Sequence, residues 1–137
     1  MNERKFNMVK VFCFDQFNKY ELLKSYLKGC KTIQLYYSYD VEEAAQKIKK
    51  IKPDILLYGG DFNSEEWKAP QLWHRVIEEV LDYRNIYTII TTWNSDEARA
   101  MKAVSPKSFY LPFCESLANV VKTRARMINT RKRKNAP

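Results

Sequence analysis

The sequence predicts a three-layer α/β domain built on a five-stranded parallel sheet, and two observations lead to this fold class. Apolar runs of strand length alternate along the chain with segments of helical spacing, in the pattern βαβαβαβαβα. The central run, Ile55–Tyr58, has no polar alternation and lies between Pro53 and Gly59, as expected of a strand buried on both faces. Strict alternation favours helices on both faces of the sheet. Five strands with right-handed crossovers favour the order 2-1-3-4-5.

The first half of the chain is expected to contain three strands and two helices. The strands are rich in apolar and aromatic residues and lie at 9–14, 32–37 and 55–58. One helix covers residues 18–28 and stops at Gly29. The other begins after Asp40, a favourable cap residue, and ends before Pro53.

The second half completes the alternation. After a long loop at 61–70, the expected elements are a helix to about residue 83, a strand at 86–92, a weak helix to about 104, a strand at 108–111 and a helix from about 115. The last helix has an apolar face only as far as Ile128. The chain is therefore divided into an N-terminal extension (1–8), one domain (9–128) and a basic C-terminal tail (129–137).

Charge and cysteine content indicate where the positive charge is concentrated and which cellular compartment is expected. The net charge is +8, and seven bases and no acid follow Glu115, so the rest of the chain is almost neutral. The three cysteines are odd in number and form no CxxC motif, which favours reduced thiols and a cytoplasmic location. No apolar run is long enough to span a membrane, and no apolar signal segment is evident at the N-terminus.

Five segments carry a family resemblance when their order and spacing are considered together. They are Tyr39-Asp-Val-Glu-Glu-Ala-Ala, Ile51-Lys-Pro-Asp-Ile-Leu-Leu, Ile89-Ile-Thr-Thr, Asp96-Glu-Ala-Arg-Ala-Met-Lys-Ala and Leu111-Pro-Phe. In this arrangement the chain resembles the receiver domain of two-component response regulators over residues 9 to about 128. The resemblance implies a flavodoxin-like, CheY-like (βα)5 sandwich.

The resemblance also implies a phosphorylation pocket, and here that pocket is degenerate. In the family, a pair of acids binds Mg²⁺, an aspartate accepts the phosphoryl group, and a hydroxyl and a lysine before a cis-proline complete the site. Carried over one position at a time, the acid pair falls on Asp15 and Gln16, and the acceptor falls on Gly59. The hydroxyl falls on Thr91, the lysine on Leu111 and the proline on Pro112. Glycine has no nucleophile, leucine has no charge, and one carboxylate holds a hard cation poorly. A pseudo-receiver with no catalytic residue, metal or cofactor is therefore expected, with a cis Leu111–Pro112 bond.

Several other residues have a structural interpretation beside a functional one. Asp61 is interpreted as a turn or cap residue rather than a displaced phosphoacceptor. The glycine pair that starts at Gly59 is interpreted as a place where the backbone can turn tightly at the end of a strand, rather than as a phosphate-binding loop. Thr91, or Thr92 if the register slips by one, can simply satisfy backbone groups. His74 has no second ligand at zinc spacing.

The leading functional hypothesis is a phosphorylation-independent module that contacts another protein or a second copy of itself. In receivers such contacts commonly use the face of helix 4, strand 5 and helix 5. The corresponding residues here are Arg99, Lys102, Lys107, Phe109 and Tyr110. Exposed aromatic residues beside arginine fit the composition of interfaces. The alternative is that Phe109 or Tyr110 belongs to the core.

Two other functions remain open. The basic C-terminus could contact nucleic acid through its clustered cations, Arg124, Arg126, Arg131, Lys132, Arg133 and Lys134. The simpler interpretation of such a run is a solvated, disordered tail. An enzyme is disfavoured, because no nucleophile–base pair is visible in the sequence.

Overall fold

The structure is a computed structural model that describes residues 8–15, 17–38, 40–59, 86–92, 95–104 and 107–135. Its strands are β1 (Val9–Phe14), β2 (Ile33–Ser38), β3 (Ile55–Tyr58), β4 (Tyr87–Ile90) and β5 (Phe109–Tyr110). Its helices are α2 (Phe17–Tyr26), α3 (Val41–Ile51), α5 (Ser95–Val104) and α6 (Glu115–Asn135). The predicted loop at 61–70, the helix to about 83, and Gln16, Asp61 and His74 lie outside the described residues.

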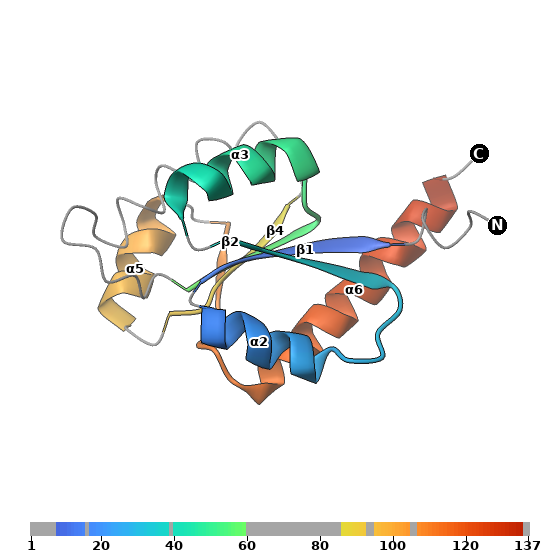
Figure 1. Cartoon of the computed structure of the whole chain (residues 1–137), viewed down its shortest axis with the longest axis horizontal. Helices are drawn as coiled ribbons and strands as arrows, with labels where there is room; N and C mark the ends of the chain where they lie inside the picture. The colour runs from blue at the N-terminus through green and yellow to red at the C-terminus, as the bar shows by residue number, and fades with distance from the viewer. Residues whose placement is uncertain are drawn as a thin grey trace.

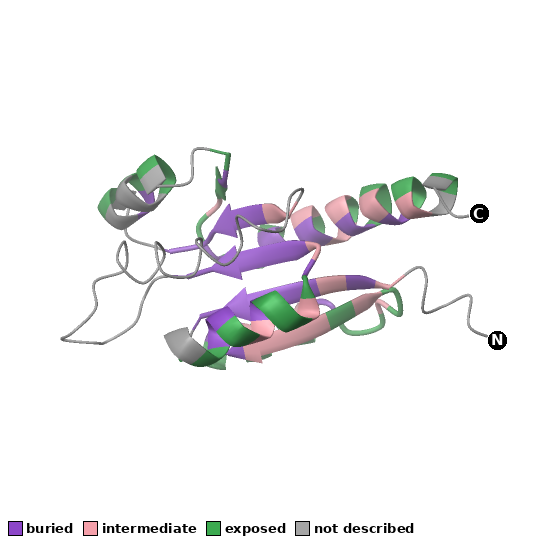
Figure 2. Ribbon diagram, turned by 90° about the horizontal axis from the view of Figure 1, so that it is seen from above, coloured by how far each residue is buried: buried purple, intermediate pink, exposed green. Residues whose placement is uncertain are grey.

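The strands form one sheet in the order β2-β1-β3-β4-β5, and each neighbouring pair is parallel (Figure 1). The predicted fold class and strand order are therefore confirmed. Figure 2 shows β1 and β3 as the most completely buried part of the sheet, whereas β2, at one edge, is largely intermediate in burial. A central position explains why β3 is apolar throughout and why β1 contains only one charged residue, Lys10.

Alternate residues of the central strands enter two separate cores. On one side, Phe12, Leu56 and Ile90 pack beneath α3 and α5. On the other side, strand residues such as Val11 and Leu57 pack against α2 and α6. This two-sided burial is the main source of stability, since each fully buried large apolar side chain contributes about 1.5–3 kcal/mol.

The helix ends follow the local signals in the sequence. Asp40 caps α3, because its Oδ1 accepts a hydrogen bond of 3.1 Å from the Glu43 N–H. At the other end, Lys52 adopts a left-handed conformation with φ of 55° just before Pro53. Gly29 has φ of 90° after α2, a conformation that favours glycine at a helix stop.

The C-terminal helix extends further than its apolar face predicts. Helix α6 continues to Asn135, through the segment that the sequence analysis treats as a tail. Its Lys132 Nζ lies 3.0 Å from Asp54 Oδ2 and donates to the Met8 carbonyl at 3.2 Å. Asp54 also accepts from the Lys10 N–H at 2.9 Å, so one carboxylate joins the start of β3 to β1 and to the end of α6. Polar contacts thus continue the docking of α6 beyond the last apolar turn.

Candidate functional site

The pocket lies where the carboxyl ends of β1, β3 and β4 meet. Asp15 follows β1, Gly59 follows β3 and Thr91 follows β4, and all three are buried. Backbone hydrogen bonds hold them together, because the Gly59 N–H donates to the Phe14 carbonyl at 3.1 Å and the Thr91 N–H donates to the Tyr58 carbonyl at 2.7 Å. In an open parallel sheet this edge is the usual position of a ligand site.

The Asp15 carboxylate occupies the space directly above Gly59. A Cβ added at position 59 would overlap all three atoms of that carboxyl group. The φ of Gly59 is not in the left-handed region, so backbone permissiveness does not explain this glycine. The position is glycine because another side chain fills the place where its own would begin.

A buried lysine accompanies this carboxylate. Lys19, in the first turn of α2, is 1% exposed, as is Asp15, and its Nζ lies 3.6 Å from Asp15 Oδ1. The Thr91 hydroxyl donates to Asp15 Oδ2 at 3.5 Å. Burying a charge is costly unless it is paired and hydrogen-bonded, and Asp15 has both kinds of partner. Lys19 was not among the site residues identified from sequence, and its spacing of four residues from Asp15 was the available signal.

Two other expected pocket positions, Leu111 and Pro112, follow β5 and carry no charged group. Leu111 is half-buried and packs against the core beneath α2 and α6, and Pro112 is exposed. No peptide bond between described residues is cis, so the expected cis Leu111–Pro112 bond is wrong. A trans X–Pro bond is intrinsically favoured by about 0.5–1 kcal/mol, and Leu111 has no charged group to direct into the pocket.

The pocket residues that the structure describes offer one carboxylate and one lysine. Its single described carboxylate is already paired with a cation from the same chain. Among the described residues, no group of three or more His, Cys, Asp or Glu is placed to hold a metal ion. Phosphoryl transfer needs a free nucleophile and compensation of the transferred charge. The described groups supply one carboxylate and one lysine, and these two neutralise each other.

Cys13, at the core beside this pair, is 1% exposed. Burial raises the pKa of its thiol, the negative charge of Asp15 raises it further, and the positive charge of Lys19 acts in the opposite direction. The thiol is therefore protonated at neutral pH and behaves as a small apolar side chain. Cys114, by contrast, is exposed.

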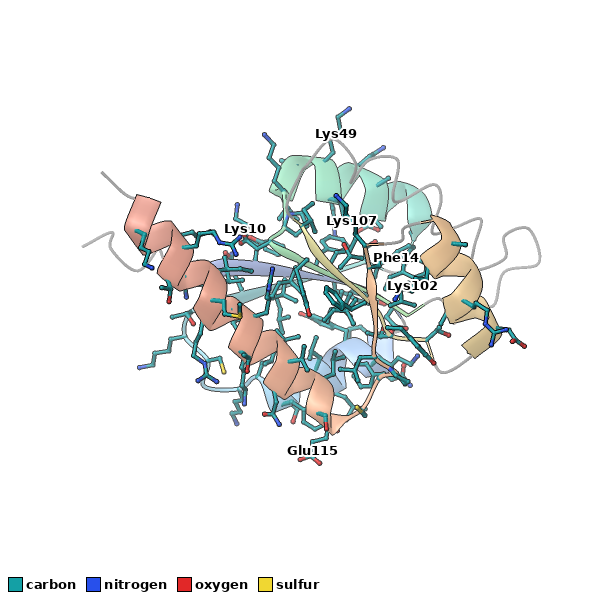
Figure 3. The ribbon with its side chains drawn as sticks, turned by 180° about the vertical axis from the view of Figure 1, so that it is seen from behind. Lys10, Phe14, Lys49, Lys102, Lys107 and Glu115 are labelled. Carbon is teal, nitrogen blue, oxygen red and sulfur yellow. The ribbon has the colours of Figure 1, made fainter. Side chains whose placement is uncertain are left out.

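The predicted interaction face lies at the edge of the sheet formed by β5, opposite the edge formed by β2. Arg99, Lys102 and Lys107 are exposed, and Figure 3 shows Lys102 and Lys107 near α5 and β5. Phe109 is 53% exposed and Tyr110 is 37% exposed, so neither is a core residue. The reason is that β5 is an edge strand of only two residues.

One side of this face is an ordered aromatic layer. The ring of Phe109 stacks on Tyr87 with centroids 4.9 Å apart. The Arg124 guanidinium lies over the Tyr87 ring, 4.3 Å from its centroid. Arg124 is therefore committed to an aromatic ring rather than projecting into solvent.

The other predicted nucleic-acid contacts include both exposed cations and a cation that is paired within the chain. Arg126, Arg131 and Lys134 are exposed on α6. Lys132 is held by Asp54, and the side chain of Arg133 lies outside the described residues. The described part of the basic segment is thus a docked helix with some free cations.

In the described part of the chain, no helix is both long and apolar enough to cross a membrane.

Comparison with known proteins identifies the fold. No family model matches the chain, and no curated protein matches its sequence. Among solved structures, the chain is similar to the chemotaxis protein CheY4 of Vibrio cholerae, with 18% identity, a TM-score of 0.64, and coverage of 87% of this chain and 98% of that one. It is also similar to the REC domain of AraT, a response regulator from Geobacillus stearothermophilus, with 14% identity, a TM-score of 0.66, and coverage of 92% and 98%.

A third similar structure is a two-component transcriptional regulator AraC from Clostridium phytofermentans, with 16% identity, a TM-score of 0.66, and coverage of 93% of this chain and 99% of that one. At these identities the likeness establishes the fold. The chain has the CheY-like fold of response-regulator receiver domains, over nearly its whole length.

Proposed function

We propose that this receiver-fold chain is a signalling module that works without phosphorylation, by surface contact with another protein or with a second copy of itself. The observation that carries the proposal is the Asp15 carboxylate above Gly59, buried and paired with Lys19. A phosphoryl group entering this space would have to displace a carboxylate and add charge to a closed ion pair. On this proposal the chain is not an enzyme and carries no cofactor.

The face around β5 is the proposed contact surface. It combines exposed Phe109 and Tyr110 with the exposed cations of α5 and of the turn before β5. Interface centres are enriched in aromatic residues and arginine, and a few such residues carry most of the binding energy. The stack of Phe109 on Tyr87 holds one aromatic ring in place, which lowers the entropy lost on binding.

Incubation with acetyl phosphate and Mg²⁺ is expected to leave the protein unmodified, because position 59 has no carboxylate and Asp15 is already paired. Intact-mass spectrometry is the measurement, with a receiver that keeps its acceptor aspartate as the positive control. A phosphoryl group found on the wild type and lost in Asp61→Asn would show that an alternative acceptor works, and the proposal would be abandoned.

Nucleic-acid contact through α6 is the second candidate, supported by the exposed Arg126, Arg131 and Lys134 on one continuous helix. Duplex DNA binding is expected to be insensitive to sequence and steeply salt-dependent, with a slope of about −0.9 per phosphate contacted. Replacing these three residues with Gln should flatten the slope and leave the fold intact, because Lys132 keeps its bond to Asp54.

A titration at two salt concentrations tests this candidate, with Phe109→Ser as the matched control on the other proposed surface. If the wild type shows no binding at about 50 mM salt, where phosphate contacts are strongest, the nucleic-acid candidate is rejected. If Phe109→Ser flattens the slope as much as the Gln variant does, the contact is not made by α6.

A further inference from the structure

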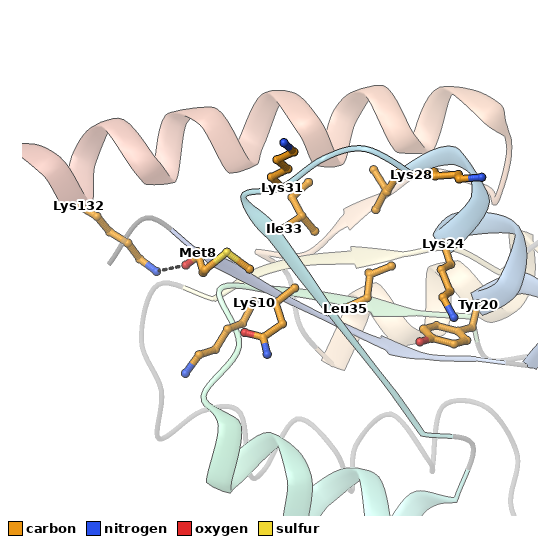
Figure 4. A pocket seen from close by; sticks show the side chains of 11 residues that line it. Met8, Lys10, Tyr20, Lys24, Lys28, Lys31, Ile33, Leu35 and Lys132 are labelled. Carbon is orange, nitrogen blue, oxygen red and sulfur yellow. Dashed lines mark hydrogen bonds between the residues drawn. The ribbon is translucent and has the colours of Figure 1, made fainter. Parts of the chain in front are cut away.

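A groove runs beside the edge strand β2, on the side of the sheet that α2 and α6 cover (Figure 4). It encloses about 1150 Å³. Its apolar floor includes Leu27, Ile33 and Leu35, and Figure 4 shows Ile33 and Leu35 projecting from β2 toward the helices. Its basic rim consists of Lys24, Lys28 and Lys31. We refer to this space and the eleven residues that line it as the β2 groove.

The charge of the β2 groove is of one sign. Five of the eleven lining residues are lysines and none is acidic. Two of the five are already engaged, because Lys132 pairs with Asp54 and Lys10 Nζ donates to the Ile51 carbonyl at 3.2 Å. The three rim lysines form no ion pair with any described residue. An anionic partner would therefore meet cations that are free to bind it.

The backbone of β2 is open along the same groove. The only described strand that pairs with β2 is β1. The Val9 N–H donates to the Thr32 carbonyl at 2.7 Å, and in a parallel ladder this contact leaves Ile33, Leu35 and Tyr37 with backbone groups that point away from β1. The Ile33 N–H and the Tyr37 carbonyl are bonded elsewhere in the chain. Leu35, in the middle of the strand, presents both its N–H and its carbonyl outward.

The sequence of β2 does not protect this edge. Edge strands usually carry charged residues or proline, which prevent them from pairing with a strand of another chain. The six residues of β2, Ile33–Ser38, include no charge and no proline. The lysines lie instead on α2 and on the turn that follows it, beside the strand. They would repel a second copy of this chain, whose net charge is +8, and would attract an acidic strand.

Aromatic rings extend the β2 groove at one end. Tyr20 lines it and stacks on Tyr37 with centroids 4.7 Å apart. Phe17 packs edge-on against Tyr37 at 5.5 Å and is 55% exposed. Aromatic residues are enriched in protein-binding surfaces relative to the rest of a protein surface.

We propose that the β2 groove binds an acidic, extended peptide segment of a partner protein. The segment would add beside β2 through the backbone of Leu35 and would place carboxylates against the rim lysines. A lipid or nucleic-acid ligand would neutralise the lysines but lacks alternating backbone donors and acceptors for the strand edge. This surface is at the other edge of the sheet from β5, so the proposal is independent of the proposed function.

The test is fluorescence anisotropy with a fluorescein-labelled octapeptide of alternating Glu and Val, compared with its Lys–Val counterpart. The wild type should bind only the acidic peptide. The triple variant Lys24→Glu, Lys28→Glu and Lys31→Glu should bind it at least about tenfold more weakly, because three charge contacts become repulsive. The matched control is Lys49→Glu, Lys50→Glu and Lys52→Glu, three exposed lysines at the end of α3, with the same change of net charge, and it should stay within about threefold of the wild type.

Hydrogen exchange supplies a second measurement, because the Leu35 amide should exchange more slowly when the peptide is bound. The proposal is overturned by equal losses in the two triple variants, by an absence of saturable binding in the wild type, or by an unchanged Leu35 amide. Tighter binding of phosphatidylserine vesicles or single-stranded DNA than of the acidic peptide, lost in the groove variant, would also overturn it.

Discussion

Replacing Gly59 with alanine is expected to destabilise the protein by at least about 1–3 kcal/mol, the usual cost of overpacking a filled interior. The added methyl group would overlap the Asp15 carboxyl group, which lies in a buried site and is paired with Lys19. Relief of the overlap requires the carboxylate to move within this buried site. Urea unfolding monitored by circular dichroism measures the effect as a change in midpoint at constant slope.

Gly29→Ala is the matched control for this prediction. Gly29 has φ of 90°, and a Cβ there would meet no atom within 4 Å. Its substitution costs only the backbone strain of a left-handed residue, about 1–2 kcal/mol. A better test is Gly59→Ala in the background Asp15→Ala with Lys19→Met, where the overlap is absent and the cost should largely disappear. If the cost of Gly59→Ala is the same in both backgrounds, Asp15 does not fill the space above Gly59.

The same geometry bears on attempts to restore a phosphoacceptor. Gly59→Asp places a carboxylate in a space that Asp15 already occupies, and it would bring two like charges together. We therefore expect that Gly59→Asp alone does not create a working phosphoacceptor. The glycine at position 59 and the inward placement of Asp15 form one structural feature, because a side chain at position 59 would overlap the Asp15 carboxyl group.

The fold was predictable because its signals are local. The strands at Val9–Phe14 and Ile55–Tyr58 match their predicted bounds, since burial on both faces produces a predominantly apolar run. The cap at Asp40 and the stop at Gly29 act through their own backbone. The end of α6 was not predictable from its apolar face, because the contact of Lys132 with Asp54 joins residues 78 positions apart.

The meeting of three of the expected pocket residues was predictable from the sequence, but the buried ion pair among them was not. The resemblance placed Asp15, Gly59 and Thr91 at one edge of the sheet, and the structure brings them together. Lys19 was missed because a lysine in the first turn of a helix normally reaches solvent. Its burial depends on Asp15 turning inward, which in turn requires a glycine more than forty positions away in the sequence.

Lys19→Met is expected to destabilise the protein by about 3–5 kcal/mol, because it leaves the Asp15 carboxylate buried without its cation. Such a loss is a large fraction of the 5–15 kcal/mol that typically stabilises a domain. Removing both charges, in Asp15→Ala with Lys19→Met, should cost less than Lys19→Met alone, because no unpaired charge then remains in the interior. Denaturant unfolding of the two variants measures the difference.

Lys47→Met is the matched control, because Lys47 pairs with Glu43 at the same spacing of four residues and a distance of 2.6 Å. Both of those side chains are exposed, at 42% and 53%, and breaking a surface pair costs about 0–1 kcal/mol. Burial alone should therefore separate the two lysine substitutions by several kcal/mol. If Lys19→Met costs no more than Lys47→Met, the carboxylate of Asp15 is reached by water in solution, and the pocket is open to ligands rather than closed by its own ion pair.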